Sequence, residues 1–354
     1  MQQPDPVEIM KLNRIVVYSV IGLFLILITI YAFFIYGKTG QYRDFEDYIL
    51  GTYVRIKISS KVNPEKIAKA IFTEMRRLEE KYDPYRKGSV LDVLNHSEDW
   101  VQVDDETLAL VDLALKLAKQ TEGAFDPALG RLIDLWGFSK YSQRSEGEFR
   151  VPEPGEIKEA LLYSGYQKIA VDYLKKSVKT NGAWLDFGGI LKGYALKRAY
   201  QIAKEYDKNC HGFIEAGGQI MILGPKFGRA NWIVGIRNPR GNTYDSISYV
   251  YLKEGSIATS GDYERYFEVD GVRYHHILDP QTGLPSRGAI SVSVVSDDPI
   301  LADALSTAGF VLGKDRWLYT RTLFPKYGAE VLLVTPEMKI LKTDNFSIYE
   351  NPDR

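Results

Sequence analysis

Residues 290–313 of the chain read ISVSVVSDDPILADALSTAGFVLG. The alternation from Ile290 to Val295 is typical of a β-strand, and Asp298-Pro299 followed by an apolar run that stops at Gly313 is typical of a helix. The same kinds of pattern predict helices after Asn63-Pro64, around 108–118 and over 190–203, and strands over 53–58, 247–252 and 330–334. Because helices and strands do not alternate regularly, we expect an α+β fold, a single catalytic domain with mixed sheets and flanking helices, rather than a doubly wound sheet.

Composition excludes several classes of protein. The 354 residues carry 45 Lys+Arg against 46 Asp+Glu, a net charge of −1, which argues against a nucleic-acid partner because such proteins usually carry a basic surplus. The 45% of hydrophobic residues excludes a disordered chain. One cysteine, Cys210, excludes an internal disulfide or a Cys-based zinc cluster, and four histidines argue against a multi-histidine metal site.

The N-terminal region predicts a membrane anchor. Residues 15–36 are uncharged and mostly apolar, long enough as a helix to span the hydrocarbon core, and no cleavage site follows them. We therefore expect a short tail at 1–14, a transmembrane helix at 15–36, a juxtamembrane linker at 37–47 and the catalytic domain at 48–354. No later segment is long and apolar enough to cross the membrane a second time. We therefore favour an orientation with the short tail inside the cell and the large domain outside.

The motif ADALST, residues 302–307, predicts a cation site. Asp303 and Thr307 are four residues apart on the expected helix, so both oxygens project from one face. A carboxylate with a hydroxyl suits a hard cation such as Mg²⁺, which leaves places for phosphate oxygens. The alternative is a surface aspartate and a threonine that bonds back to its own helix.

Two more motifs suggest chemistry. In HHILDPQTG, residues 275–283, His276 is a candidate proton acceptor that Asp279 could orient; the alternative is a hairpin with an exposed histidine pair. In LDFGGILKG, residues 185–193, glycines precede a helix that has Lys192 in its first turn. This arrangement fits an anionic ligand or is an ordinary strand-to-helix turn.

Taken in order, these segments resemble the ApbE family of FAD:protein FMN transferases. The resemblance covers about residues 48–335 and is carried by LGT (50–52), GAFDPALG (123–130), LWGF (135–138), LDFGGILKGYA (185–195), GG (217–218), SIATSGDYERYF (256–267), HHILDPQTG (275–283) and ADALSTAGFVLG (302–313). It implies a Mg²⁺-dependent enzyme that cuts the pyrophosphate of FAD, joins FMN through a phosphoester to a Thr or Ser of a target flavoprotein, and releases AMP.

The resemblance also implies roles for residues at matching positions. Asp303, Thr307 and the backbone carbonyl of Gly189 would hold the metal, and His276 would accept the proton of the attacking hydroxyl. Contacts to FAD are implied for eight residues: Leu50, Tyr85, Ala124, Phe125, Asp126, Asp186, Lys192 and Ile277. Gln219 and Glu215, beside the glycine pair, depart from the family pattern and are expected to stay clear of the metal motif.

Two other functions remain open at this point. A FAD pyrophosphatase would use the same metal and nucleotide contacts with water in place of the hydroxyl. A non-catalytic flavin-binding protein on the membrane would have no need of a proton acceptor. The resemblance implies a bacterial protein, so the expected location is the inner membrane, crossed once, with the catalytic domain on the outer, periplasmic side.

Overall fold

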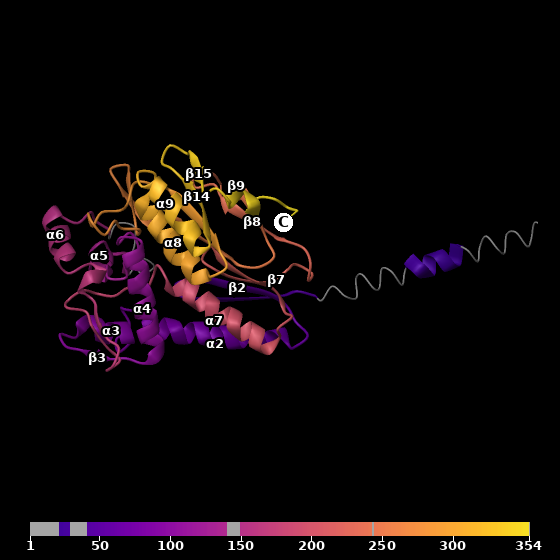
Figure 1. The fold of residues 1–354 in the computed structure, drawn as a ribbon, viewed down its shortest axis with the longest axis horizontal. Helices are drawn as coiled ribbons and strands as arrows, with labels where there is room; N and C mark the ends of the chain where they lie inside the picture. The colour runs from indigo at the N-terminus through magenta and orange to yellow at the C-terminus, as the bar shows by residue number, and fades with distance from the viewer. Residues whose placement is uncertain (1–20, 29–40, 140–148, 243, 354) are drawn as a thin grey trace, which may run out of the picture. The chain divides into compact units, whose positions relative to one another are not determined.

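The computed structural model describes residues 21–28, 41–139, 149–242 and 244–353 (Figure 1). The chain divides into two units, Met1–Tyr42 and Arg43–Arg354. In the first unit residues 21–28 are helical, and the rest of the predicted transmembrane segment 15–36 lies outside the described residues. Among the residues described, no helix has both the length and the apolar character needed to cross a bilayer. In the second unit, strand β1 begins at Arg43, within the segment 37–47 predicted as a linker.

The second unit is built on an eight-stranded sheet with the order β1-β2-β6-β7-β10-β13-β14-β15. Each neighbouring pair in it is antiparallel, and so are the smaller pairings β3-β5-β4, β8-β9 and β11-β12. The α+β class is therefore confirmed, but the expectation of mixed sheets is wrong for the described part of the chain. The strands are β1 (Arg43–Ile49), β2 (Thr52–Ser59), β3 (Val101–Gln102), β4 (Ala170–Asp172), β5 (Ser177–Lys179), β6 (His211–Ala216), β7 (Gln219–Gly224), β8 (Trp232–Arg237), β9 (Ser246–Leu252), β10 (Ser256–Gly261), β11 (Tyr266–Val269), β12 (Val272–His275), β13 (Ser291–Ser296), β14 (Ala329–Val334) and β15 (Ile340–Lys342).

The helices begin where the sequence carries capping residues. Asn63 and Asp298 accept backbone N–H groups at the starts of α2 and α8, each followed by proline in the first turn. Asp104 caps α4 through the N–H of Thr107. The helices are α2 (Pro64–Tyr82), α3 (Val90–His96), α4 (Asp105–Gln120), α5 (Gly130–Leu135), α6 (Pro154–Leu162), α7 (Leu191–Tyr206), α8 (Pro299–Leu312), α9 (Trp317–Leu323) and α10 (Phe346–Tyr349), with 3₁₀ turns η3 (Tyr166–Lys168) and η4 (Phe324–Tyr327).

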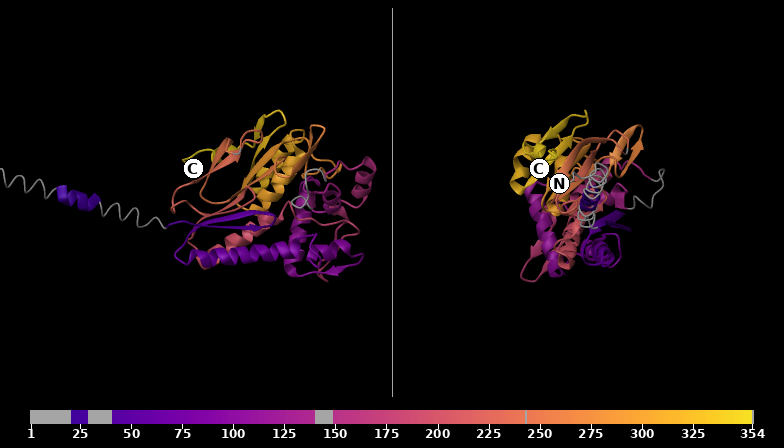
Figure 2. Two further views of the ribbon diagram at one scale, coloured as in Figure 1. Left: turned by 180° about the vertical axis from the view of Figure 1, so that it is seen from behind. Right: turned by 90° about the vertical axis from the view of Figure 1, so that its right-hand side faces the viewer.

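Three helices layer against the sheet. Helix α8 packs on β10 and β13, α7 packs on α8, and α2 packs on α7. The three helices are labelled in Figure 1 and seen from behind in Figure 2, with α8 in orange-yellow, α7 in pink and α2 in purple. All six residues of β13 are buried, because α8 covers one face of the strand and the other face also lies inside the protein. The valine–serine alternation of this strand therefore divides its side chains between two buried faces. Val292 faces α8, since a Cβ added to Gly309 of that helix would lie 3.1 Å from it. Ser293, on the opposite face, shares a hydrogen bond with Thr259.

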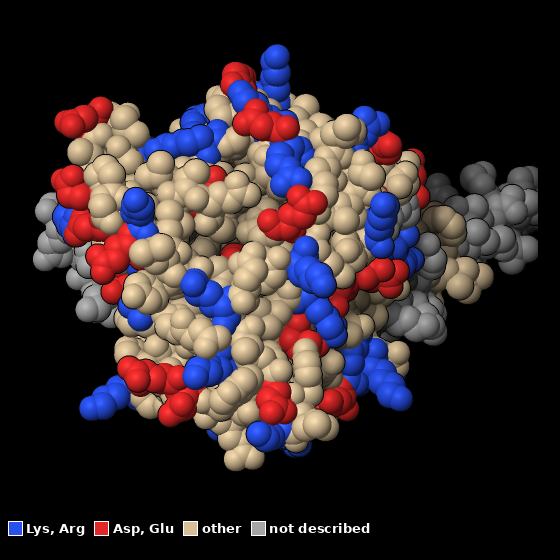
Figure 3. Space-filling view, turned by 60° about the vertical axis from the view of Figure 1, so that its left-hand side comes forward, with Lys and Arg blue, Asp and Glu red and all other residues tan. Residues whose placement is uncertain are grey.

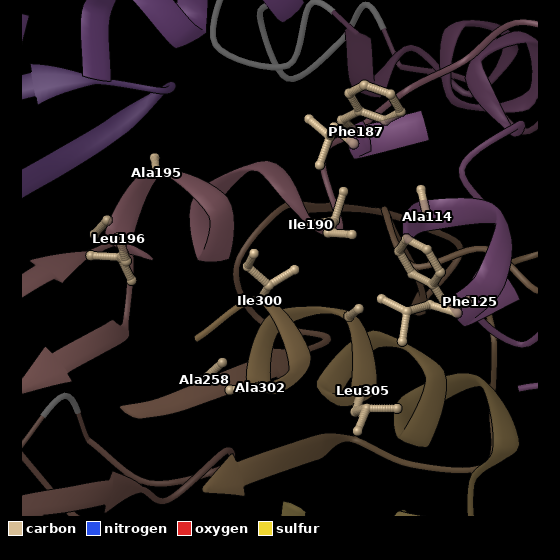
Figure 4. Close-up of a cluster of buried hydrophobic side chains, with 14 of the residues drawn as sticks. Ala114, Phe125, Phe187, Ile190, Ala195, Leu196, Ala258, Ile300, Ala302 and Leu305 are labelled. Carbon is tan, nitrogen blue, oxygen red and sulfur yellow. The ribbon is translucent and has the colours of Figure 1, made fainter. Parts of the chain in front are cut away.

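The core places the site segments on a rigid base. One large cluster of buried apolar side chains joins the sheet to α2, α4, α7 and α8, and it includes Phe125, Phe187 and Ile190 from the predicted site loops (Figure 4). A smaller cluster gathers Trp136, Phe138, Phe267 and Leu278. On the face shown in Figure 3, acidic and basic side chains are interspersed, with no broad area of one sign.

Candidate active site

The centre of the site is the crossing of α7 and α8 at Gly193. A Cβ atom at Gly193 would lie 2.3 Å from the carbonyl oxygen of Pro299 and 2.8 Å from the Cβ of Asp303, so only glycine permits this approach. The close approach lets the backbone N–H of Gly193 donate to Oδ2 of Asp303 at 2.8 Å. The motif LDFGGILKG is thereby joined to ADALST, 110 residues later.

The predicted metal ligands meet at this crossing. Asp303 is 2% exposed, and its other oxygen, Oδ1, accepts from the side-chain amide of Gln219. A Cβ at Gly189 would lie 3.3 Å from Oγ1 of Thr307, which places the Gly189 backbone beside the Thr307 hydroxyl. That hydroxyl also lies 3.4 Å from the carbonyl of Asp303, the back-bond expected of a helical threonine. In the described residues no three His, Cys, Asp or Glu side chains group as metal ligands. The predicted ligand set accordingly consists of the Asp303 carboxylate and neutral oxygens.

The loop 185–190 is held by backbone bonds and by one buried amide. Asn95, 4% exposed, donates to the carbonyl of Leu185 at 2.9 Å and accepts its N–H at 2.7 Å. The N–H of Asp186 donates to Pro127 at 2.8 Å, and that of Gly130 to Trp184 at 2.9 Å. The two motifs GAFDPALG and LDFGGILKG are therefore paired side by side, which no local pattern in either one indicates.

Asp186 and Tyr85 form a second pair of predicted site residues. The Tyr85 hydroxyl lies 3.3 Å from Oδ2 of Asp186, and Oδ1 accepts the N–H of Gly188 at 2.7 Å. Burial raises the pKa of Asp186, against the lowering effect of these hydrogen bonds and of the nearby Arg265 charge. Burial and the carboxylate of Asp186 raise the pKa of Tyr85, so its hydroxyl stays a donor. Lys192 lies over the same loop, with Nζ 3.2 Å from the Gly188 carbonyl.

The two adjacent histidines differ in their free ring nitrogens. Both ring nitrogens of His275 are occupied, Nε2 by the Ser286 carbonyl at 2.8 Å and Nδ1 by the N–H of Ile277 at 3.3 Å. Within the described part of the chain His276 uses only Nδ1, which lies 3.2 Å from the carbonyl oxygen of Arg265. Because a carbonyl only accepts, Nδ1 carries the proton and Nε2 keeps its lone pair. The expectation that Asp279 orients His276 is wrong, since Asp279 accepts the N–H of Gln281 and Arg265 holds the ring.

The surroundings of His276 keep it neutral. Burial, followed by the positive charges of Arg265, His275 and Lys192, lowers the pKa of His276 to about 3. At neutral pH the free Nε2 is therefore a proton acceptor. The segment 275–283 that carries His276 is held by Trp136, whose indole N–H donates to the carbonyl of Gly283 at 2.8 Å. The LWGF motif thus supports the HHILDPQTG segment.

The remaining predicted residues serve the framework as well as the site. Phe125 reaches Gly189, where a Cβ would lie 3.2 Å from its ring, and Ala124 beside it is buried. The two carboxylate oxygens of Asp126 accept hydrogen bonds from the N–H groups of Ala128 and Tyr166. Burial raises the pKa of Asp126 to about 6.

Leu50 and Ile277 hold two turns in place. Leu50 has φ 59° in the turn between β1 and β2, and its N–H donates to Glu79. The adjacent Gly51 lies beside Arg265: a Cβ atom at residue 51 would lie 3.2 Å from the Arg265 guanidinium. Ile277 is buried, and its carbonyl accepts the N–H of Ser286 at 3.0 Å. These two hydrogen bonds fix the turn between β1 and β2 and the segment that follows His276.

Sequence reasoning missed three contributors. Arg265 orients His276, Asn95 clamps the loop at Leu185, and Gln219 contacts Asp303, contrary to the expectation that it would stay clear of the metal motif. Arg265 lies inside SIATSGDYERYF and Gln219 directly follows the glycine pair, so both were within recognised motifs. Asn95 had no such signal, because it stands in an ordinary helix-end segment.

Comparison with known proteins agrees with this geometry. A model of the ApbE family matches residues 50–327. The FAD:protein FMN transferase of Treponema pallidum is 33% identical over 332 residues, which cover 86% of this chain and 88% of the relative. The crystal structure of the ApbE protein of Thermotoga maritima superposes with a TM-score of 0.83 at 48% identity, over 88% of this chain and 100% of that one. The flavin transferase ApbE from Vibrio cholerae gives a TM-score of 0.75 at 25% identity, over 87% and 99% of the two chains. The family model covers most of the chain, and the Treponema pallidum relative is more than 30% identical over most of both chains, so this chain belongs to the ApbE family.

Proposed function

We propose that this protein is an FAD:protein FMN transferase that cleaves the pyrophosphate of FAD, joins FMN to a Thr or Ser hydroxyl of a target flavoprotein by a phosphoester bond, and releases AMP. The observation that carries the proposal is His276, a neutral histidine with a free Nε2 whose charged neighbours are Lys192 and Arg265. A proton acceptor beside two cations suits a hydroxyl nucleophile that attacks a phosphate.

The residues present fit a Mg²⁺ ion. Asp303 is a buried carboxylate whose oxygens each accept one hydrogen bond and retain further lone pairs. Thr307 and the Gly189 backbone add neutral oxygens. Hard oxygen donors of this kind are those that Mg²⁺ prefers. When bound, Mg²⁺ would neutralise charge that develops on the phosphate oxygens during transfer.

The side chains of the protein have distinct tasks in the reaction. His276 Nε2 takes the proton as the acceptor oxygen forms its bond to the flavin-side phosphorus, while the bond from that phosphorus to the bridging oxygen breaks and AMP leaves. The Arg265 carbonyl holds the ring and stabilises the protonated form. Lys192 and Arg265 attract the pyrophosphate, and Tyr85 with Asp186 offers hydrogen bonds to the bound nucleotide.

One assay tests the reaction. The protein is incubated with FAD, MgCl₂ and candidate flavoprotein subunits, and covalent flavin is read as fluorescence on a denaturing gel while AMP is measured in solution. We expect fluorescence on the acceptor in step with AMP. AMP formed at the same rate with no acceptor would indicate a pyrophosphatase, and FAD binding without AMP a flavin-binding protein.

We further propose that residues 15–36 anchor the protein in the bacterial inner membrane, with the catalytic domain on the periplasmic side. The support is the 22-residue uncharged run in the sequence. Removing residues 1–40 leaves β1 intact, since that strand begins at Arg43. The truncated protein should leave the membrane fraction and retain transfer activity. Truncated protein that still sediments with membranes would contradict the anchor.

A further inference from the structure

Gln219, the first residue of β7, lies against the carboxylate of Asp303 and is 3% exposed. Its Nε2 donates to Oδ1 of Asp303. Its Oε1 is buried and has no hydrogen-bond partner among the described residues. A buried amide oxygen without a partner costs free energy, so its position calls for a group that the folded chain does not supply.

The covalent geometry of the amide locates this unpartnered oxygen. Oε1 and Nε2 share one carbon atom, so Oε1 lies next to the edge of the Asp303 carboxylate that Nε2 contacts. The Asp303 carboxylate is the anionic group of the proposed Mg²⁺ site. A partner for Oε1 can therefore come from the contents of that site.

We propose that Oε1 of Gln219 accepts a hydrogen bond from a water molecule bound to the divalent cation on Asp303, which makes Gln219 a positioning residue for the hydrated cation. The inference rests on the metal dependence in the proposed function. Mg²⁺ usually keeps several waters, and each cation-bound water is a strong donor. The ligand set proposed above holds one carboxylate, that of Asp303, which leaves room for such waters, and Gln219 gives one of them a fixed acceptor.

The two ends of the amide make opposite predictions, which allows a clean test. Donation from Nε2 competes with the cation for Oδ1, so losing that donation alone leaves Mg²⁺ affinity equal or higher. Losing the Oε1 acceptor releases the water and lowers affinity. Gln219→Met removes both ends in nearly the same volume, so the sign of the change shows which end matters.

The experiment is calorimetric titration of the folded protein with MgCl₂ alone. We expect Gln219→Met to weaken Mg²⁺ binding about 10-fold, the scale seen when an outer partner of a metal ligand is removed. Gln219→Glu keeps an oxygen and adds charge, so it should bind Mg²⁺ more tightly than the unchanged protein, and it decides the matter if the methionine variant does not fold. The control is Thr320→Val on α9, which removes another buried, unpartnered oxygen and should leave the affinity unchanged.

Each outcome has one meaning. Weaker binding by Gln219→Met with an unchanged Thr320→Val control supports the inference. Equal or tighter binding by Gln219→Met, or weaker binding by Gln219→Glu, overturns it while leaving the transferase proposal intact. If the unchanged protein takes up no Mg²⁺ although it transfers FMN with another cation or none, the metal assignment fails and this inference fails with it.

Discussion

The backbone N–H of Gly193, in the first turn of α7, donates to Oδ2 of Asp303 on α8 at 2.8 Å. The bond joins the loop proposed to hold the nucleotide to the carboxylate proposed to hold the cation. It exists only because no side chain separates the two helices at residue 193. Orientation of the carboxylate and packing of the core therefore depend on the same glycine.

Gly193→Ala should destabilise the fold by about 1–3 kcal/mol, the usual cost of inserting a methyl group into a filled space. The new Cβ would meet backbone atoms of Pro299 and Ile300, which cannot rotate away. Thermal or denaturant unfolding measures the change. Gly155→Ala on α6 is the matched control, since nothing lies within 4 Å of its added Cβ, and it should be neutral or slightly stabilising. Equal stability of the two variants would contradict the close crossing.

His276→Ala should lower the transfer rate by about 10²–10⁴-fold, the scale of a lost general base, while FAD and Mg²⁺ affinities stay nearly unchanged. The residual rate should rise with pH, because hydroxide can take the proton instead. His275→Ala is the contrasting variant. Its ring nitrogens are both bonded inside the fold, so it should lower the melting temperature first. Transfer by His276→Ala at the original rate at pH 7 would show that this histidine is structural.

The pH profiles of kcat and kcat/KM should separate on the acid side. In the free protein the pKa of His276 is lowered to about 3, so the ring stays neutral and kcat/KM loses nothing to its protonation as the pH falls from 7 to 5. Bound pyrophosphate brings negative charge, favours the protonated ring and raises its pKa, so the acid limb of kcat lies at higher pH. Steady-state rates with saturating acceptor test this. An acid limb of kcat/KM near 6.5 that His276→Ala abolishes would refute it.

Asp303→Asn should reduce transfer by about 100-fold or more if Asp303 holds the proposed metal, because several kcal/mol of charge stabilisation would then depend on that carboxylate. Part of the rate should return at high MgCl₂ if lost affinity is the main defect. The new amide N–H would face a donor, either Gly193 or Gln219, so unfolding must be measured alongside. Thr307→Val, which removes only a neutral oxygen, should give a smaller loss. A full rate for Asp303→Asn at low Mg²⁺ would exclude the carboxylate as a ligand.

Two aspartates of the recognised motifs, Asp262 and Asp279, are unsuited to act as the base. The carboxylate of Asp262 is 6% exposed and paired with both guanidinium nitrogens of Arg240, at 2.8 and 2.6 Å. Asp279 accepts a backbone N–H two residues away and closes its own turn. Counting contacts with the described residues, His276 and not His275 has an unoccupied ring nitrogen, so His276 is the proton acceptor that the geometry favours.

Local structure followed from the sequence where the cause was local. Asn63 and Asp298 announce the starts of α2 and α8 because each caps N–H groups within three residues, and the four-residue spacing of Asp303 and Thr307 sets their common face. The ordered motifs also identified the family, because the site is made of several short segments and each of them carries a recognisable motif in the sequence.

Only the tertiary structure decided which groups meet. Gln219 and Asp303 are 84 residues apart, and Asn95 and Leu185 are 90 apart. Neither pair has any spacing rule that sequence can express, because the pairing depends on how a strand, two helices and a loop pack around one core. The same holds for His276, whose base nitrogen is set by the Arg265 carbonyl and not by Asp279, its neighbour in sequence. Helix caps and helical faces depend on residues a few positions apart in the sequence. The burial of a group, its pKa and the position of its proton depend on every group that the folded chain brings within a few ångströms of it.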